Sequence, residues 1–418
     1  MKSPVAALLL TVTVAAPAAC VLSTQVGEEP AVDASVPPPP WRWPSAPIDI
    51  LFVIDNSGSM AEEQQRLADA LTAAHDESSL CNSSNIAALR AFLKEHESVP
   101  PEQWPEPYLS WFEACSMTDL LELMNIDFHA GILTTDMHDC DAPYGGAPRA
   151  SVPQRGCLQT SASDAGTAVV QRSTPQRIER MQDIVRTVGL WGSAWEQGLA
   201  ALEHFVTPGH SVPSPGTCAL ARDCSGDLRD FLRTQVDDEL GNPKEVPLLV
   251  VLLSDEDDCS NDSTIDEQQP GSTDLCYSQP DLLTSTARYS DLLRGLKSSP
   301  QLVTLVLISG LVEEGDTALA SGCALREGAT STACDPAFGN SVATCDNCVN
   351  GTPVCACHPA IDAAQCQGVA HAATQCCEAD AAHRYLEVAA ALPRHLYATL
   401  CQPSYHDVLR RGLWMALQ

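Results

Sequence analysis

Basic residues are scarce in this sequence. Its 418 residues include 23 Lys and Arg against 54 Asp and Glu, which gives a formal net charge of −31 at pH 7. Such a chain repels the phosphate backbone of DNA or RNA, so the charge argues against a nucleic-acid partner. It also lacks the polybasic face by which proteins dock on anionic lipid. The carboxylate excess is compatible with bound cations, although most of these side chains are expected to form a solvated acidic surface.

Catalytic motifs and membrane helices are absent as well. No segment beyond the N-terminus reaches the ~20 apolar residues of a membrane-spanning helix. The sequence contains no Gly-x-Ser-x-Gly, no His-Glu-x-x-His and no phosphate-binding glycine loop. Histidines such as His129, His138 and His204 are scattered, and their spacing identifies no general base. The sequence therefore gives little support to catalysis.

The N-terminus has the pattern of an export signal. Lys2 precedes a short apolar core, VAALLLTVTVAAPAAC, which ends in small residues. Ala16-Pro17-Ala18 fits an ordinary signal-peptidase site, whereas Ala18-Ala19-Cys20 resembles a bacterial lipobox in which Cys20 would become the acylated first residue. We expect residues 1–20 to be a signal peptide of the lipoprotein type, with Cys20 as its lipidation site. The expected location is the outer membrane or cell surface, with a periplasmic or secreted protein as the alternative.

Cysteine content agrees with export. The chain has 19 cysteines, and lipidation of Cys20 would leave an even set that can pair completely. At this density, cysteines of an exported protein are expected to form disulfides. Residues 21–47, with Pro37 to Pro40 in a row, cannot build a core and are expected to form an extended tether.

From residue 48 onward, apolar runs alternate with amphipathic segments. We expect strands at 48–55, 126–136, the start of 246–258, 301–311 and 394–401, and helices at 61–75, 174–188, 193–205, 289–298 and 405–417. Strands that are apolar throughout and alternate with helices predict an α/β fold with a doubly wound, mostly parallel sheet. Long stretches at 76–125, 207–245 and 312–392 are expected to be insertions, and the last holds nine cysteines.

Polar side chains follow several of these strands at their carboxyl ends, where ligands bind in sheets of this kind. The stretch IDILFVIDNSGSM (48–60) places Asp55, Ser57 and Ser59 directly after an apolar strand, and Thr135 and Asp255 follow two others. A carboxylate with two hydroxyls suits Mg²⁺, which prefers oxygen ligands in near-octahedral geometry. Because hydroxyls leave the charge of the ion incompletely neutralised, the metal could accept a further anionic oxygen from a partner protein.

These motifs resemble the metal-ion-dependent adhesion site of the von Willebrand factor A domain family. DNSGSM is similar to the first metal loop of the family, with Asp55, Ser57 and Ser59 in the ligand positions, and LLSDED is similar to the third, with Asp255. The second loop matches GLWGSAWEQGLAAL, where Ser193 stands in place of the usual threonine and Thr135 is the fallback ligand.

The resemblance covers roughly residues 48–206, 246–310 and 394–417, and the insertions are unmatched. It implies a Rossmann-like von Willebrand factor A domain over residues 48–418, with a disulfide-rich insertion. It also implies a bound Mg²⁺ or Mn²⁺, with Ca²⁺ as a further option, and a protein partner whose acidic side chain reaches the metal.

Each of these signals has a simpler interpretation. Ser57 or Ser59 would merely cap the following helix, and Ser193 would cap its own. The acidic run DEDDCSNDSTIDE (255–267) fails as an EF-hand and is expected to be mostly a solvated rim, with Cys259 in a disulfide for which Cys276 is a candidate partner. In CDNCVNGTPVCACH (345–358), disulfides are expected rather than a zinc site.

The function expected from the sequence is divalent-metal-dependent protein–protein interaction or adhesion by an exported, membrane-anchored protein. Two alternatives come from other classes. One is a metal-dependent hydrolase whose active site is completed by the insertions, and the other is a structural protein of the cell envelope.

Overall fold

The computed structural model describes three long parts of the chain and three short strands. The described residues are 47–137, 156–312 and 382–418, apart from gaps at 73–79, 97–98, 100–102, 162–167, 191, 193–194, 208–225, 238–240, 262–264, 266–275, 277–278 and 401–403, together with 320–321, 348–349 and 352–353. The expected signal peptide with Cys20, nearly all of the tether, Ser193, His138 and most of the cysteine-rich insertion lie outside these residues.

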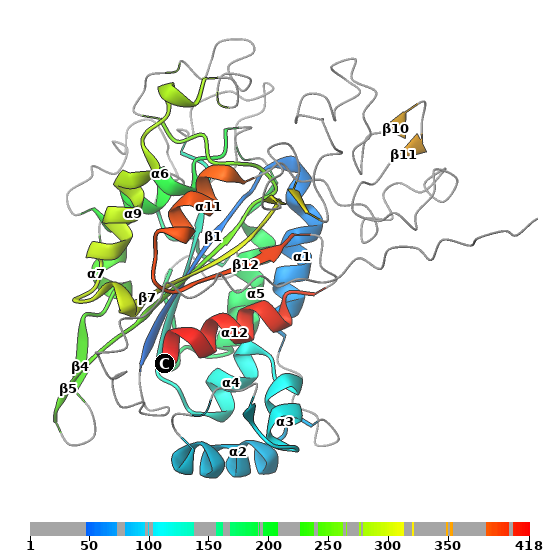
Figure 1. Cartoon of the computed structure of the whole chain (residues 1–418), viewed down its shortest axis with the longest axis vertical. Helices are drawn as coiled ribbons and strands as arrows, with labels where there is room; N and C mark the ends of the chain where they lie inside the picture. The colour runs from blue at the N-terminus through cyan, green and yellow to red at the C-terminus, as the bar shows by residue number, and fades with distance from the viewer. Residues whose placement is uncertain are drawn as a thin grey trace, which may run out of the picture.

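One six-stranded sheet, in the order β12-β7-β6-β1-β2-β3, forms the centre of the molecule (Figure 1). Its strands are β1 (Ile48–Ile54), β2 (Phe128–Thr134), β3 (Val170–Gln171), β6 (Leu248–Leu253), β7 (Val303–Ser309) and β12 (His395–Thr399). Every neighbouring pair is parallel except β2 and β3. The expected α/β architecture with a mostly parallel sheet is therefore confirmed.

Helices cover both faces of the sheet. Successive side chains of a strand point to opposite faces, so each strand contributes to two apolar clusters. Ile50 and Phe52 of β1 pack into one apolar cluster with helices α1, α5 and α12, whereas Leu51 and Val53 pack into a second cluster with α6, α9 and α11. The two helical layers lie on opposite sides of the sheet in Figure 1. These helices are α1 (Ala61–Ala70), α5 (Arg177–Thr187), α6 (Gly198–Val206), α9 (Thr286–Gly295), α11 (His383–Ala390) and α12 (His406–Leu417).

The segment 76–125, expected as an insertion, contributes to the core. It contains α2 (Ser83–Glu95), α3 (Tyr108–Ala114) and α4 (Met117–Leu123), whose apolar side chains join the same cluster as α1 and α12. The Cys81–Cys115 disulfide connects the start of α2 to the end of α3. α4 begins with a capping box, in which Ser116 and Asp119 satisfy each other's backbone N–H groups.

The other two expected insertions also contain regular elements. Residues 207–245 include α7 (Asp227–Phe231) and the hairpin of β4 (Gln235–Asp237) and β5 (Pro243–Glu245). Residues 312–392 include α11, which packs against β7 and α9 as part of the helical layer. The remaining elements are η1 (Gly58–Met60), η3 (Pro280–Leu282), η4 (Pro300–Leu302), β8 (Leu311–Val312), β9 (Ala320–Ser321), β10 (Cys348–Val349) and β11 (Thr352–Pro353). No helix among the described residues is long and apolar enough to cross a membrane.

A buried ion network explains the one acid within β1. Asp49 is fully buried and accepts hydrogen bonds from the Nε atom of Arg233 at 2.8 Å and the Nζ atom of Lys297 at 3.1 Å. Lys297 also donates to the backbone carbonyl of Arg233 at 2.6 Å. The network fixes the amino-terminal end of β1, at the edge of the sheet opposite to Asp55.

Candidate metal centre

The register of the central strands brings three chain segments to one edge of the sheet. Ile54, the last residue of β1, lies beside Thr134 of β2 and beside Leu253 of β6. The next residues continue this pairing: the Asp55 N–H donates to the Leu253 carbonyl at 2.9 Å, and the Thr135 N–H donates to the Ile54 carbonyl at 3.2 Å. The order of the strands reverses between β1 and β6, and in open α/β sheets ligands bind at such a point.

Asp55 is fully buried at this edge, and its carboxylate is oriented by two donors. Oδ1 accepts the Ser57 backbone N–H at 2.7 Å, and Oδ2 accepts the Ser254 hydroxyl at 2.8 Å. A carboxylate offers about four lone-pair directions, so each oxygen retains acceptor capacity. The side chain of Gln64 donates to the Asp55 carbonyl at 3.0 Å and to the Gly189 carbonyl at 3.1 Å. It therefore connects α1 to the loop after β1 and to the second loop, which begins at Gly189.

The hydroxyl oxygens of Ser57 and Ser59 lie 3.0 Å apart. For ligands about 2.0–2.1 Å from an octahedral Mg²⁺, adjacent oxygens are separated by about 2.9 Å, so this pair matches one edge of the octahedron. Neither hydroxyl caps a helix, since Ser57 makes no capping hydrogen bond to η1 and Met60 is the N-cap of α1. The simpler interpretation of these serines as helix caps is therefore wrong.

Two further carboxylates are buried nearby with unused oxygens. Asp255 is 4% exposed and Glu196 is 1% exposed, and neither Asp255 Oδ1 nor Glu196 Oε1 has a hydrogen-bond partner. Burial, followed by the negative charge of Asp55, raises the pKa of both carboxyl groups, while a hydrogen bond from Ser59 lowers that of Asp255. A divalent cation would offset both effects by neutralising the local negative charge.

The backbones of the first and second loops are in direct contact. The Gly192 N–H donates to the Asn56 carbonyl at 2.8 Å, and a Cβ atom on Gly192 would lie only 2.7 Å from that carbonyl oxygen. Ser193, the expected ligand of this loop, is outside the described residues. Thr135, the fallback, is fully buried, and its hydroxyl donates to Oε2 of Glu196.

Sequence reasoning missed Glu196 and Ser254. Both signals were present, because Glu196 lies three residues beyond Ser193 in the second-loop motif and Ser254 immediately precedes Asp255. Their importance depends on the tertiary contacts with Thr135 and Asp55, which the local sequence does not reveal.

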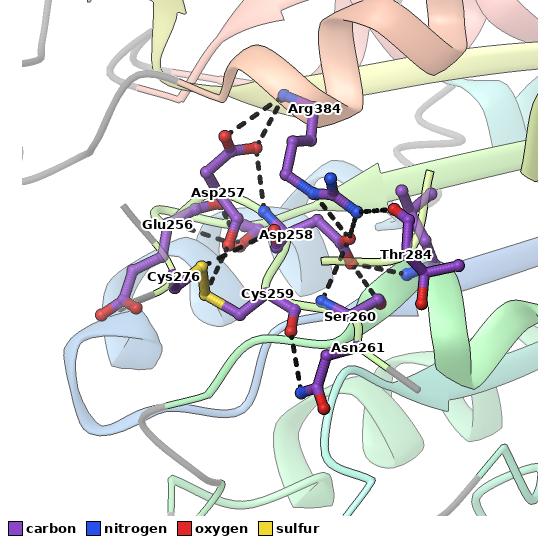
Figure 2. The surroundings of a disulfide bond; sticks show 12 residues. Glu256, Asp257, Asp258, Cys259, Ser260, Asn261, Cys276, Thr284 and Arg384 are labelled. Atoms are coloured by element: carbon purple, nitrogen blue, oxygen red, sulfur yellow. Dashed lines mark hydrogen bonds and ion pairs between the residues drawn. A yellow bond between two sulfur atoms is a disulfide. The ribbon is translucent and has the colours of Figure 1, made fainter. Parts of the chain in front are cut away.

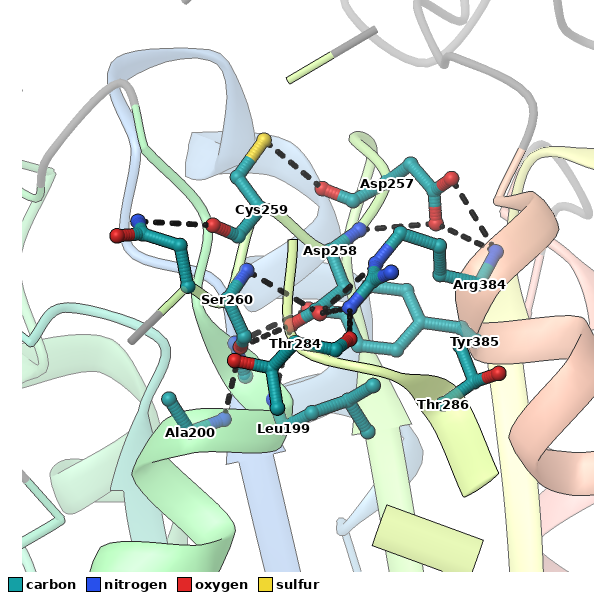
Figure 3. Close-up of polar contacts among 12 residues, drawn as sticks. Leu199, Ala200, Asp257, Asp258, Cys259, Ser260, Thr284, Thr286, Arg384 and Tyr385 are labelled. Atoms are coloured by element: carbon teal, nitrogen blue, oxygen red, sulfur yellow. Dashed lines mark hydrogen bonds and ion pairs between the residues drawn. The ribbon is translucent and has the colours of Figure 1, made fainter. Parts of the chain in front are cut away.

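In the described part of the acidic run after β6 (255–261 and 265), most residues are buried, so this part is not the solvated rim expected from its composition. Asp257 and Asp258 are buried, and Asp258 is held by Arg384 of α11, whose Nε and Nη2 atoms lie 3.2 and 3.1 Å from Oδ2 (Figure 3). Oδ1 of Asp258 accepts the Leu199 N–H at 3.1 Å, near the start of α6. Asp257 accepts the Arg384 N–H at 3.0 Å, near the start of α11, and burial raises its pKa to about 8. These side chains therefore satisfy backbone N–H groups in the first turns of α6 and α11.

The disulfide expected for this region is confirmed. Cys259 is bonded to Cys276, and Figure 2 shows this bond beside the acidic loop. Both cysteines pack with Trp195, which precedes Glu196, in a small apolar cluster. The disulfide therefore supports the second loop as well as the third.

The donor set fits a hard cation. Within the described parts of the chain, no three His, Cys, Asp or Glu side chains are grouped so as to hold a metal by themselves, so a site here depends on hydroxyl oxygens as well. Carboxylate and hydroxyl oxygens suit Mg²⁺ and Mn²⁺, and Ca²⁺ accepts the same atoms in a looser geometry.

Comparison of the chain with protein-family models, with curated proteins and with solved structures finds no match.

Proposed function

We propose that this chain is a von Willebrand factor A-type protein that binds a partner protein through a divalent cation. The observation that carries the proposal is the convergence of Asp55, the Ser57–Ser59 hydroxyl pair and Asp255 at the point where the strand order reverses. The strand order, with its antiparallel edge strand β3, is compatible with that fold.

Ser57 and Ser59 would contact the cation directly, and Asp55 and Asp255 would act partly through water. Ser193 or Thr135 would supply the second-loop ligand. The cation, Mg²⁺ or Mn²⁺ with Ca²⁺ as a further option, would bridge to an acidic side chain of the partner. Ser59 is exposed whereas Asp55, Ser57 and Asp255 are buried, so a partner would approach the cation from the side of Ser59.

The proposed location is outside the cytoplasm. Cys20 would carry the lipid that anchors the chain to the outer membrane, and the proline-rich segment 21–47 would hold the domain away from the bilayer. Adhesion or recognition at the cell envelope is the role that this arrangement favours.

Isothermal titration with Mg²⁺ and Mn²⁺ tests the proposal. Asp55→Ala should abolish binding, and Ser59→Ala should weaken it at least about tenfold. Ser59 is exposed, so its variant is expected to fold normally. Asp69→Ala, which removes an exposed carboxylate of α1, is the matched control and should bind like the wild type. Unchanged binding by Asp55→Ala would exclude a metal site here.

A pull-down from cell envelopes, with and without EDTA, tests the interaction itself. A partner that is captured by the wild type, lost with EDTA and lost with Asp55→Ala supports metal-dependent binding. A partner retained in EDTA would contradict it.

A further inference from the structure

Glu196 has a fixed backbone position between the end of β2 and the loop that follows β6. Its carbonyl accepts the Cys259 N–H at 2.6 Å, and the N–H of Gln197 donates to the Thr135 carbonyl at 3.1 Å. The adjacent Trp195 is buried against the Cys259–Cys276 disulfide. The loop that carries Glu196 is thus attached both to the residue after β2 and to the segment after β6.

The side chain of Glu196 is constrained at one oxygen and unused at the other. Oε2 accepts the hydroxyl of Thr135, whereas Oε1 is buried without a hydrogen-bond partner. The charges that act on it are those of Asp55, Asp255 and Glu256, all negative. None of the lysine, arginine or histidine side chains in the described parts of the chain forms an ion pair with Glu196.

An ionised carboxylate buried in this way is costly unless a cation or several donors compensate it. The protein compensates Asp258, another fully buried acid of the region, with Arg384 and two backbone N–H groups. It provides Glu196 with a single hydroxyl. This difference between Asp258 and Glu196 indicates that Oε1 of Glu196 binds a ligand that is not part of this chain.

We propose that Glu196 is a ligand of the cation, binding through Oε1 and taking the second-loop place that the sequence assigns to Ser193. Thr135 is then a positioning residue that holds Glu196 through Oε2. This inference rests on the proposed metal-dependent function, since it concerns the same cation.

A third carboxylate changes the charge of the bound site. Asp55, Asp255 and Glu196 carry three negative charges against the two positive charges of the cation, so the occupied site is no longer electropositive. The cation is therefore held firmly without a partner, because affinity rises with the number of charged ligands. An acidic side chain of a partner would reach the metal by displacing Oε1 of Glu196.

The test compares Mn²⁺ and Mg²⁺ titrations of the wild type with Glu196→Gln, Glu196→Asp and Glu256→Gln. Glu256 is the matched control, because it acts on the same carboxylates electrostatically and the proposal gives it no ligand role. Glu196→Gln should weaken Mn²⁺ binding at least tenfold, and Glu256→Gln by less than threefold. Glu196→Asp keeps the charge and retracts the oxygens, so it should also lose more affinity than the control.

Water proton relaxation by bound Mn²⁺ gives a second readout. Loss of a protein ligand opens a coordination position, so Glu196→Gln should raise the relaxivity of the bound ion, whereas Glu256→Gln should not change it. Far-UV circular dichroism of the metal-free variants checks that each is folded.

The outcomes separate the two proposals. If Asp55→Ala loses binding while Glu196→Gln and Glu196→Asp bind like Glu256→Gln, the ligand role of Glu196 is wrong and the metal-dependent function stands. If the wild type binds neither Mn²⁺ nor Mg²⁺, both proposals fail.

Discussion

Arg384 offers a strong test of how the loop that follows β6 is held in place. Arg384→Met keeps most of the apolar stem and removes the guanidinium group that contacts Asp258 at 3.1 Å and donates to the Thr284 carbonyl at 2.6 Å. The Asp258 side chain is fully buried and that of Arg384 is 13% exposed, so solvent screens this pair weakly. Breaking such a pair on one side costs about 3–5 kcal/mol, because the charge of Asp258 stays buried without its cation.

Denaturant unfolding of the metal-free protein measures this loss. Arg288→Met is the matched control, since Arg288 pairs with Glu203 at 2.8 Å but is 46% exposed, and the expected loss is below about 1 kcal/mol. The double variant Arg384→Met/Asp258→Asn removes both charges and should recover at least about 1 kcal/mol relative to Arg384→Met alone. A loss below about 1 kcal/mol for Arg384→Met would refute the role assigned to this pair.

Three further variants test other parts of the structure. Asp49→Asn leaves Lys297 buried without its carboxylate and should lower the free energy of unfolding by about 3–5 kcal/mol, as measured in urea. Burial raises the pKa of Glu63 from 4.5 to about 7, so ionisation of Glu63 destabilises the folded protein increasingly as the pH rises above 4.5. Glu63→Gln should therefore stabilise the metal-free protein by up to about 3 kcal/mol at pH 8 and have little effect at pH 4.5. Gly192→Ala would place a Cβ atom 2.7 Å from the Asn56 carbonyl oxygen, so it should cost about 1–3 kcal/mol and weaken Mn²⁺ binding in the same titration.

The central sheet could be predicted from the sequence because its parallel strands are covered on both faces. The runs at 48–54, 248–253 and 303–309 are almost entirely apolar, and each is a strand. The helices of 76–125 could also have been found, since Ile86, Leu89 and Phe92 recur at helical spacing and are buried. That segment was expected as an insertion because it is a long stretch that separates the first expected helix from the second expected strand.

The candidate site was only partly accessible from the sequence. Asp55 and Asp255 could be located because they directly follow apolar strands, whose carboxyl ends meet at one edge. The burial of Asp258 depends on Arg384, a residue 126 positions later in the chain, and composition alone therefore suggested a solvated loop. Glu196 was missed because it is placed at this edge by contacts with Thr135 and Cys259, which lie 61 and 63 residues away.

Anomalous diffraction from crystals grown with Mn²⁺ would locate the bound cation itself. We expect one strong anomalous peak at the edge of the sheet beyond β1 and β6, roughly 2 Å from the hydroxyl oxygens of Ser57 and Ser59. The same peak should be absent from crystals of Asp55→Ala grown under identical conditions. Fully ordered loops with no peak at this position, at Mn²⁺ concentrations that saturate the protein in solution, would contradict the metal centre.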